Sequence, residues 1–176
     1  MGGVGKTTLV GKAYHQAKDS FECAAWATVS QSYNVHGVLH ILIRQLMGPE
    51  ADVVKMQITD CSILIGELQK FLCEKSYLII LDDLWDRDAW RHIASALPEN
   101  SRGSRALVTT RKDEVISSLD WEGRRVLQLK PLSSWHSWEL FCMVAFRDSD
   151  NGTCPPHLKK TAEAIVGKCG GLPLAL

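Results

Sequence analysis

The chain has 176 residues, of which 45% are hydrophobic and 23% are charged, so it has the size and apolar content of a folded domain. Its 20 Lys and Arg residues balance its 20 Asp and Glu residues, which argues against a general polyanion binder. Apolar runs such as residues 77–81 are far too short to span a membrane, and the six cysteines form no C-x-x-C pair. We therefore expect a cytosolic protein with reduced thiols.

Taken from the N-terminus, the hydrophobic pattern predicts strands alternating with helices. The predicted helices in the first part of the chain are 6–17, 38–47, 64–72, 90–96 and 112–118. The predicted strands are 24–29, 77–81, 105–109 and 126–129, and residues 48–60 are expected to form a loop. After Pro131 the pattern predicts only helices, at 134–146 and 157–170. Strands alternating with helices indicate an α/β domain with a parallel sheet, followed by a second, incomplete helical part.

The first eight residues carry most of a phosphate-binding loop. The run Gly2-Gly3-Val4-Gly5-Lys6-Thr7-Thr8 fits the pattern G-x-x-x-x-G-K-[ST], except that its first glycine would fall one position before Met1. Glycines let backbone N–H groups turn inward around a phosphate, and the following helix directs the positive end of its dipole there. Lys6 can reach β- and γ-phosphate oxygens, and Thr7 can ligate Mg²⁺. The alternative, a flexible glycine turn, is disfavoured by Gly-Lys-Thr-Thr at a helix start.

A second segment ends in two carboxylates. Residues 77–81 are continuously apolar, as in a strand buried on both faces, and Asp82 and Asp83 follow directly. This arrangement is typical of a Walker B site, where Asp82 would contact Mg²⁺ through water and Asp83 would orient or deprotonate the attacking water. A strand that ends in an Asp-capped turn is the alternative, and the P-loop favours the nucleotide interpretation.

A third segment, residues 103–111, places two hydroxyls and an arginine after a strand. At the same sheet edge as Asp82, the Arg111 side chain could sense a γ-phosphate. Taken alone, Arg111 would be interpreted as a surface arginine. The six tryptophans, Trp85 among them, are expected to be packing residues.

With these segments in order, the chain resembles the NB-ARC domain of plant intracellular immune receptors of the nucleotide-binding, leucine-rich-repeat type, over essentially its whole length. The segments that resemble the family's motifs are 2–8 (P-loop), 21–31 (RNBS-A), 78–85 (kinase-2), 103–111 (RNBS-B), 127–132 with 137–141 and 145–146 (RNBS-C) and 170–176 (GLPL). Trp85 at the end of the kinase-2 segment, with the non-TIR form of RNBS-A, is similar to receptors that bear an N-terminal coiled coil.

The resemblance implies a P-loop NTPase fold of the STAND and AAA-related class. Residues 1–130 would be an N-terminally truncated nucleotide-binding subdomain whose parallel sheet lacks its first strand, because that strand would precede Met1. Residues 131–176 would begin the all-helical ARC subdomain. Both ends fall inside motifs, so we expect a piece of a longer protein and little activity from this piece alone.

The function implied by the resemblance is a molecular switch that is off with ADP, on with ATP, and reset by slow hydrolysis. The residues implied to bind nucleotide are Gly2, Gly3, Val4, Gly5, Lys6, Thr7, Thr8, Arg111 and Pro173. Thr7 and Asp82 would hold Mg²⁺, Asp82 and Asp83 would serve hydrolysis, Arg111 would read the γ-phosphate, and Pro173 would lie against the adenosine.

The implied partners are the nucleotide, intramolecular coiled-coil and leucine-rich-repeat regions outside this chain, and a homo-oligomer of the active receptor. The resemblance implies a cytoplasmic location, with peripheral plasma-membrane association open to the full-length protein, and no specific nucleic acid. Two other functions stay open: a P-loop kinase acting on a small acceptor, and an interaction scaffold that no longer binds nucleotide. No acceptor pocket or lid arginine cluster is evident for the kinase.

Overall fold

The structure is a computed structural model that describes residues 2–29, 31–32, 34–51, 60–119, 124–147 and 152–176. The chain divides into two compact units. One is Thr7–Val126, and the other combines Met1–Lys6 with Leu127–Leu176. The boundary between Lys6 and Thr7 falls within the P-loop sequence.

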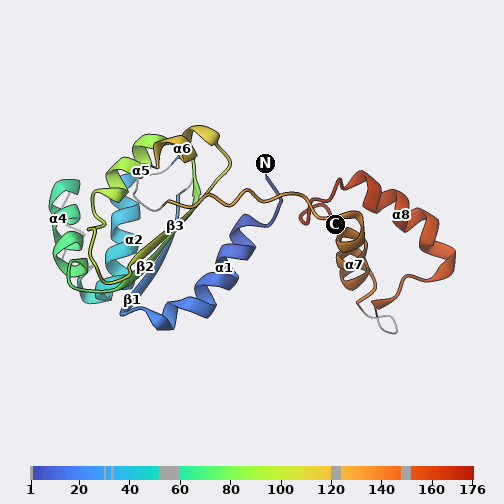
Figure 1. Ribbon diagram of the computed structural model, residues 1–176, viewed down its shortest axis with the longest axis horizontal. Helices are drawn as coiled ribbons and strands as arrows, with labels where there is room; N and C mark the ends of the chain where they lie inside the picture. Colours follow the sequence, from blue (N-terminus) through green and yellow to red (C-terminus); the bar gives the residue numbers. More distant parts are fainter. Residues whose placement is uncertain (1, 30, 33, 52–59, 120–123, 148–151) are drawn as a thin grey trace. The chain divides into compact units, whose positions relative to one another are not determined.

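The larger unit is a three-stranded parallel sheet with helices on both faces (Figure 1). Its elements in chain order are α1 (Lys6–Ala17), η1 (Lys18–Ser20), β1 (Cys23–Thr28), α2 (Val35–Met47), α4 (Cys61–Leu72), β2 (Tyr77–Leu84), α5 (Arg87–Ala94), β3 (Arg105–Thr110) and α6 (Asp113–Ser118). The strand order is β1-β2-β3, so the apolar strand β2 is central. This parallel sheet with its helices confirms the predicted α/β class.

Apolar side chains of the strands pack against helices on both faces of the sheet. On one face Ile79 and Leu81 of β2 join a single core with the leucine stripes of α2 and α4 and with apolar residues of α5. The opposite face carries Ile80, which is fully buried, and its register partner Trp26. Helix α1 covers this second face, because the Tyr14 ring meets Trp26 edge to face with centroids 5.6 Å apart. None of the residues of α1 is itself buried.

Short polar side chains fix where several helices begin. Asn34 accepts a hydrogen bond from the His36 N–H at the start of α2, and Asp60 and Asp86 cap α4 and α5 in the same way. Because of the Asn34 cap, α2 begins three residues before the apolar stripe that predicted it. Residues 49–51, predicted as loop, are helical, while residues 52–59 of that predicted loop lie outside the described part of the chain.

The carboxyl end of β2 departs from regular pairing. Leu81 pairs with Val108, the register then shifts, and Leu84 pairs with Thr110. Within this bulge Asp83 has a φ of 58°, a left-handed conformation that few non-glycine residues other than Asn and Asp adopt. At the opposite end of the strand, the hydroxyl of buried Tyr77 donates to the carbonyl of Pro98 at 2.7 Å, and burial raises the pKa of Tyr77 to about 12.

Among its described residues, the smaller unit combines helices with irregular segments. It holds α7 (Ser134–Ala145), the short η3 (Pro156–Leu158) and α8 (Lys159–Lys168), which confirms the two helices predicted after Pro131. Its small core joins Phe141 and Cys142 of α7 to Ala162 and Val166 of α8. The carbonyl of Gly171, which follows α8, accepts a hydrogen bond from the Leu132 N–H at 2.8 Å.

The strand predicted at residues 126–129 is wrong. The segment is irregular, with Val126 55% and Leu127 75% exposed. Within the described residues no neighbouring strand pairs with it, since the sheet order is β1-β2-β3. Alternating apolar residues form a strand only where a partner supplies backbone hydrogen bonds. Among the described residues, no helix combines the length and apolar character needed to cross a membrane.

Candidate functional site

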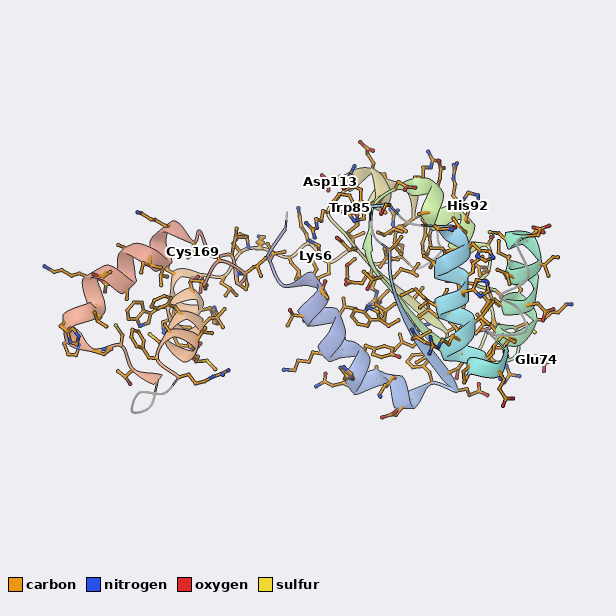
Figure 2. All side chains as sticks on the ribbon, turned by 180° about the vertical axis from the view of Figure 1, so that it is seen from behind. Lys6, Glu74, Trp85, His92, Asp113 and Cys169 are labelled. Carbon is orange, nitrogen blue, oxygen red and sulfur yellow. The ribbon has the colours of Figure 1, made fainter. Side chains whose placement is uncertain are left out.

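The glycine-rich segment that precedes α1 has the backbone expected of an anion cradle. Gly3 and Gly5 have φ values of 75° and 92°, and α1 begins at Lys6 (Figure 2). At Gly5 an added Cβ would meet no atom, so this position favours glycine because of its φ alone. The first N–H groups of a helix have no acceptor within it and are available to bind anions.

Three elements converge on the carboxylate of Asp82. The Thr7 hydroxyl, in the first turn of α1, lies 3.0 Å from both Oδ1 and Oδ2 of Asp82 at the end of β2. The Thr109 hydroxyl of β3 donates to Oδ1 at 2.6 Å. Asp82 and Thr109 are each only 5% exposed. The predicted pair of Thr7 and Asp82 is therefore in direct contact, which supports a shared role.

The oxygen atoms of Thr7 and Asp82 suit magnesium. A hydroxyl and a carboxylate are the kind of ligands that Mg²⁺ takes from proteins, with waters and phosphate oxygens filling its remaining positions. Within the described residues, no group of three or more His, Cys, Asp or Glu side chains is placed to hold a metal. The donor set thus fits a metal held mainly by a phosphate ligand rather than a dedicated protein cage.

Asp83 has different surroundings from its neighbour Asp82. Its N–H donates to the Thr109 hydroxyl at 2.8 Å, which helps to hold its left-handed backbone. Its carboxylate accepts two hydrogen bonds from Arg111, Nε to Oδ1 at 3.0 Å and Nη2 to Oδ2 at 3.2 Å. The indole Nε1 of Trp85 donates to the same Oδ2 at 3.2 Å. The structure therefore brings the predicted hydrolytic acid and the predicted phosphate sensor together as an ion pair.

The remaining predicted residues belong to the smaller unit or to the start of α1. Val4 lies between the two left-handed glycines, and Thr8 follows Thr7 on the exposed side of α1. Pro173 lies in the turn after α8, and the N–H of its neighbour Leu174 donates to the carbonyl of Gly3 at 3.2 Å. The turn that holds Pro173 is thus adjacent to the glycine-rich loop. How these residues contact a nucleotide stays a prediction.

Two residues of the site were not predicted from the sequence. Thr109 contacts both acids, and the only available signal was a pair of hydroxyls just before Arg111. Trp85 was expected to be a packing residue, but its indole N–H is hydrogen-bonded to Asp83. An aromatic residue two positions after an acid carries no such information in the sequence.

Comparisons with known proteins identify the family to which the chain is similar. A family model described as "NB-ARC domain" matches residues 1–151. The whole chain aligns with Disease resistance protein RPP13 of Arabidopsis thaliana at 39% identity and with Disease resistance protein RPM1 of the same plant at 34%. It aligns with ToMV resistance protein Tm-2(2) of Solanum lycopersicum at 35%. The chain covers 21%, 19% and 20% of these three relatives, about a fifth of their length.

Proposed function

The chain belongs to the NB-ARC family of nucleotide-binding domains, and from this premise we propose that it is the ADP/ATP switch of an intracellular plant immune receptor. The names of its relatives, resistance proteins of two plants, support a role in plant defence. In this proposal the ADP form is inactive, the ATP form signals, and slow hydrolysis returns the protein to the ADP form.

The observation that carries the proposal is the contact of Thr7 with Asp82. It joins the first turn of the helix after the glycine-rich loop to the end of the central strand, with both oxygens at 3.0 Å. A bound nucleoside triphosphate with Mg²⁺ needs a hydroxyl and a carboxylate side by side here to hold the metal. Thr7 and Asp82 would hold the magnesium, which when bound neutralises charge on the β- and γ-phosphate oxygens.

The other residues have separate roles in this proposal. The backbone N–H groups of Gly2, Gly3, Val4 and Gly5, together with Lys6 and Thr8, would surround the phosphates. Arg111 would contact the γ-phosphate, and Pro173 would lie against the adenosine. Thr109 would keep the Asp82 carboxylate aimed at the metal, because its hydroxyl donates to Oδ1 at 2.6 Å. Asp83 would accept a hydrogen bond from the attacking water.

The wider setting is part of the same proposal. We place a coiled coil and leucine-rich repeats elsewhere in the complete receptor, an oligomer in its active form, and the protein in the cytoplasm. A P-loop kinase and a nucleotide-free scaffold remain the alternatives. Transfer of phosphate to a panel of small acceptors would favour the kinase, and absence of nucleotide affinity in the full-length protein would favour the scaffold.

The proposed function is tested by Lys6→Ala in the full-length protein that carries the chain. Losing a charge-assisted hydrogen bond costs about 1.5–3 kcal/mol, so we expect ADP affinity to fall roughly 10- to 150-fold. Lys12→Ala is the matched control, because Lys12 is an exposed lysine of the same helix. Isothermal titration calorimetry with ADP measures both variants. Equal ADP affinity for the two would contradict the role given to Lys6.

A further inference from the structure

The Asp83 carboxylate is almost fully engaged by its neighbours. A carboxylate offers about four lone-pair positions, and hydrogen bonds fill three of those of Asp83. Two of these bonds come from the Nε and Nη2 edge of Arg111 and the third from the indole of Trp85. While these bonds hold, Asp83 has little capacity left to accept a hydrogen bond from water.

Trp85 contacts both members of the ion pair. Besides its hydrogen bond to Asp83, its ring lies under the Arg111 guanidinium, whose Cζ is 5.5 Å from the ring centroid. This is within the range of a cation–π contact. Trp85 is itself held between the end of β2 at Leu84 and the cap of α5 at Asp86. Figure 2 shows it at the same end of the sheet as the start of α6. Trp85 can therefore fix the direction of both charged groups.

The edge of Arg111 that binds Asp83 is also the edge that binds phosphate. The Nε and Nη2 donors of an arginine match two oxygens of a carboxylate or of a phosphate equally well, so the two anions compete for it. Resting on the proposed function, we propose that Asp83, Trp85 and Arg111 form a latch that the γ-phosphate of ATP opens. Trp85 is its positioning residue, and ADP, which has no γ-phosphate, leaves the latch closed.

Opening the latch joins two events that the proposed function otherwise treats separately. When Arg111 turns to the γ-phosphate, two acceptor positions of Asp83 become available for the attacking water. Contact of Arg111 with the γ-phosphate and release of Asp83 for hydrolysis then occur in one step. The closed latch also lowers the apparent affinity for ATP, because only the fraction of molecules with Arg111 released binds the γ-phosphate fully.

The test compares Asp83→Asn with the unsubstituted full-length protein, using ADP and the slowly hydrolysed analogue ATPγS, both with Mg²⁺. Asn tolerates the left-handed backbone at this position, so the variant removes the charge and keeps the fold. Side-chain exposures of 26% for Asp83 and 49% for Arg111 mean that solvent weakens the pair. We therefore expect ATPγS affinity to rise only about fivefold, with ADP affinity unchanged.

Further variants separate the latch from a general loss of charge. In an Arg111→Gln background, Asp83→Asn should bring no gain in ATPγS affinity. Asp88→Asn is the matched control, since Asp88 is a 74% exposed carboxylate at the start of α5 that pairs with Arg91. Trp85→Phe keeps a ring under Arg111 but removes the N–H, and should raise ATPγS affinity about twofold. The indole N–H resonance of Trp85, assigned from this variant, should shift with ATPγS and not with ADP.

The outcomes distinguish the latch from the proposed function on which it rests. If the unsubstituted protein binds neither nucleotide, the proposed function fails and the latch with it. If it binds both, but Asp83→Asn leaves ATPγS affinity unchanged or raises it equally in the Arg111→Gln background, the latch alone is wrong. An indole resonance of Trp85 that responds identically to ADP and ATPγS would also overturn it.

Discussion

The hydroxyl of Thr109 forms a hydrogen bond with each of the two acids of the site, Asp82 and Asp83. It donates to Asp82 at 2.6 Å and accepts from the N–H of Asp83 at 2.8 Å, and the residue is 5% exposed. Thr109→Val replaces this hydroxyl by a methyl group of similar volume. The change leaves packing almost intact and removes both hydrogen bonds.

The size of the effect follows from the two partners. A hydrogen bond to an ionised group contributes about 1.5–3 kcal/mol and a neutral one about 1 kcal/mol. Asp82 keeps its contact with Thr7, which limits the loss on that side. We therefore expect Thr109→Val to lower the free energy of opening this region by about 3 kcal/mol, a large part of the roughly 5–15 kcal/mol that stabilises a domain.

Hydrogen exchange of the purified full-length protein measures this locally. A loss of about 3 kcal/mol corresponds to roughly 150-fold faster exchange of the amides at the ends of β2 and β3, including that of Asp83. Thr109→Ser is the control, because it keeps the hydroxyl and loses one methyl group worth about 1 kcal/mol. If the Val and Ser variants exchange at the same rate, the hydroxyl is not what holds the two acids.

Two more predictions concern residues away from the site. Burial holds the pKa of Tyr77 at about 12, above its ordinary value near 10, so the folded protein retains this proton longer than the unfolded chain. The stability that results from this difference is complete below pH 10 and falls by at most about 2–3 kcal/mol as pH rises from 10 to 12. Urea denaturation at pH 9 and 11.5 should show a smaller decrease in the free energy of unfolding for Tyr77→Phe than for the unsubstituted protein. At Gly171, φ is 74° and an added Cβ would collide with the Leu132 carbonyl, so Gly171→Ala should break the Leu132–Gly171 hydrogen bond. Loss of exchange protection at the Leu132 amide would confirm this, and unchanged protection would contradict it.

The parts predicted well from the sequence are those that local patterns determine. The apolar run that became β2 needs cover on both faces wherever it lies, and two acids at its end must fall at one edge of a parallel sheet. Thr7 follows a glycine-rich turn at a helix start, so its approach to Asp82 was predictable from motif order alone.

The parts that were missed depend on pairing between distant segments. Thr109 reaches Asp82 and Asp83 because of the register between β2 and β3 and the bulge within it, which no local pattern encodes. The Trp85–Asp83 hydrogen bond has the same origin, since it needs the backbone turn at Asp83. Residues 126–129 have a strand-like pattern, but a strand also requires a neighbour, and that is a tertiary property.

The shallow packing of α1 has a consequence for how the protein would move. No residue of this helix is buried, and its side-chain contacts with the sheet include those of Thr7 with Asp82 and of Tyr14 with Trp26. A helix with no buried residue opens at lower free energy than the core beneath it. We therefore expect α1 to detach in brief sub-global fluctuations while β2 stays folded. A ligand bound by its first turn would suppress these fluctuations. The protection of the α1 amides from hydrogen exchange would therefore report occupancy of the phosphate loop.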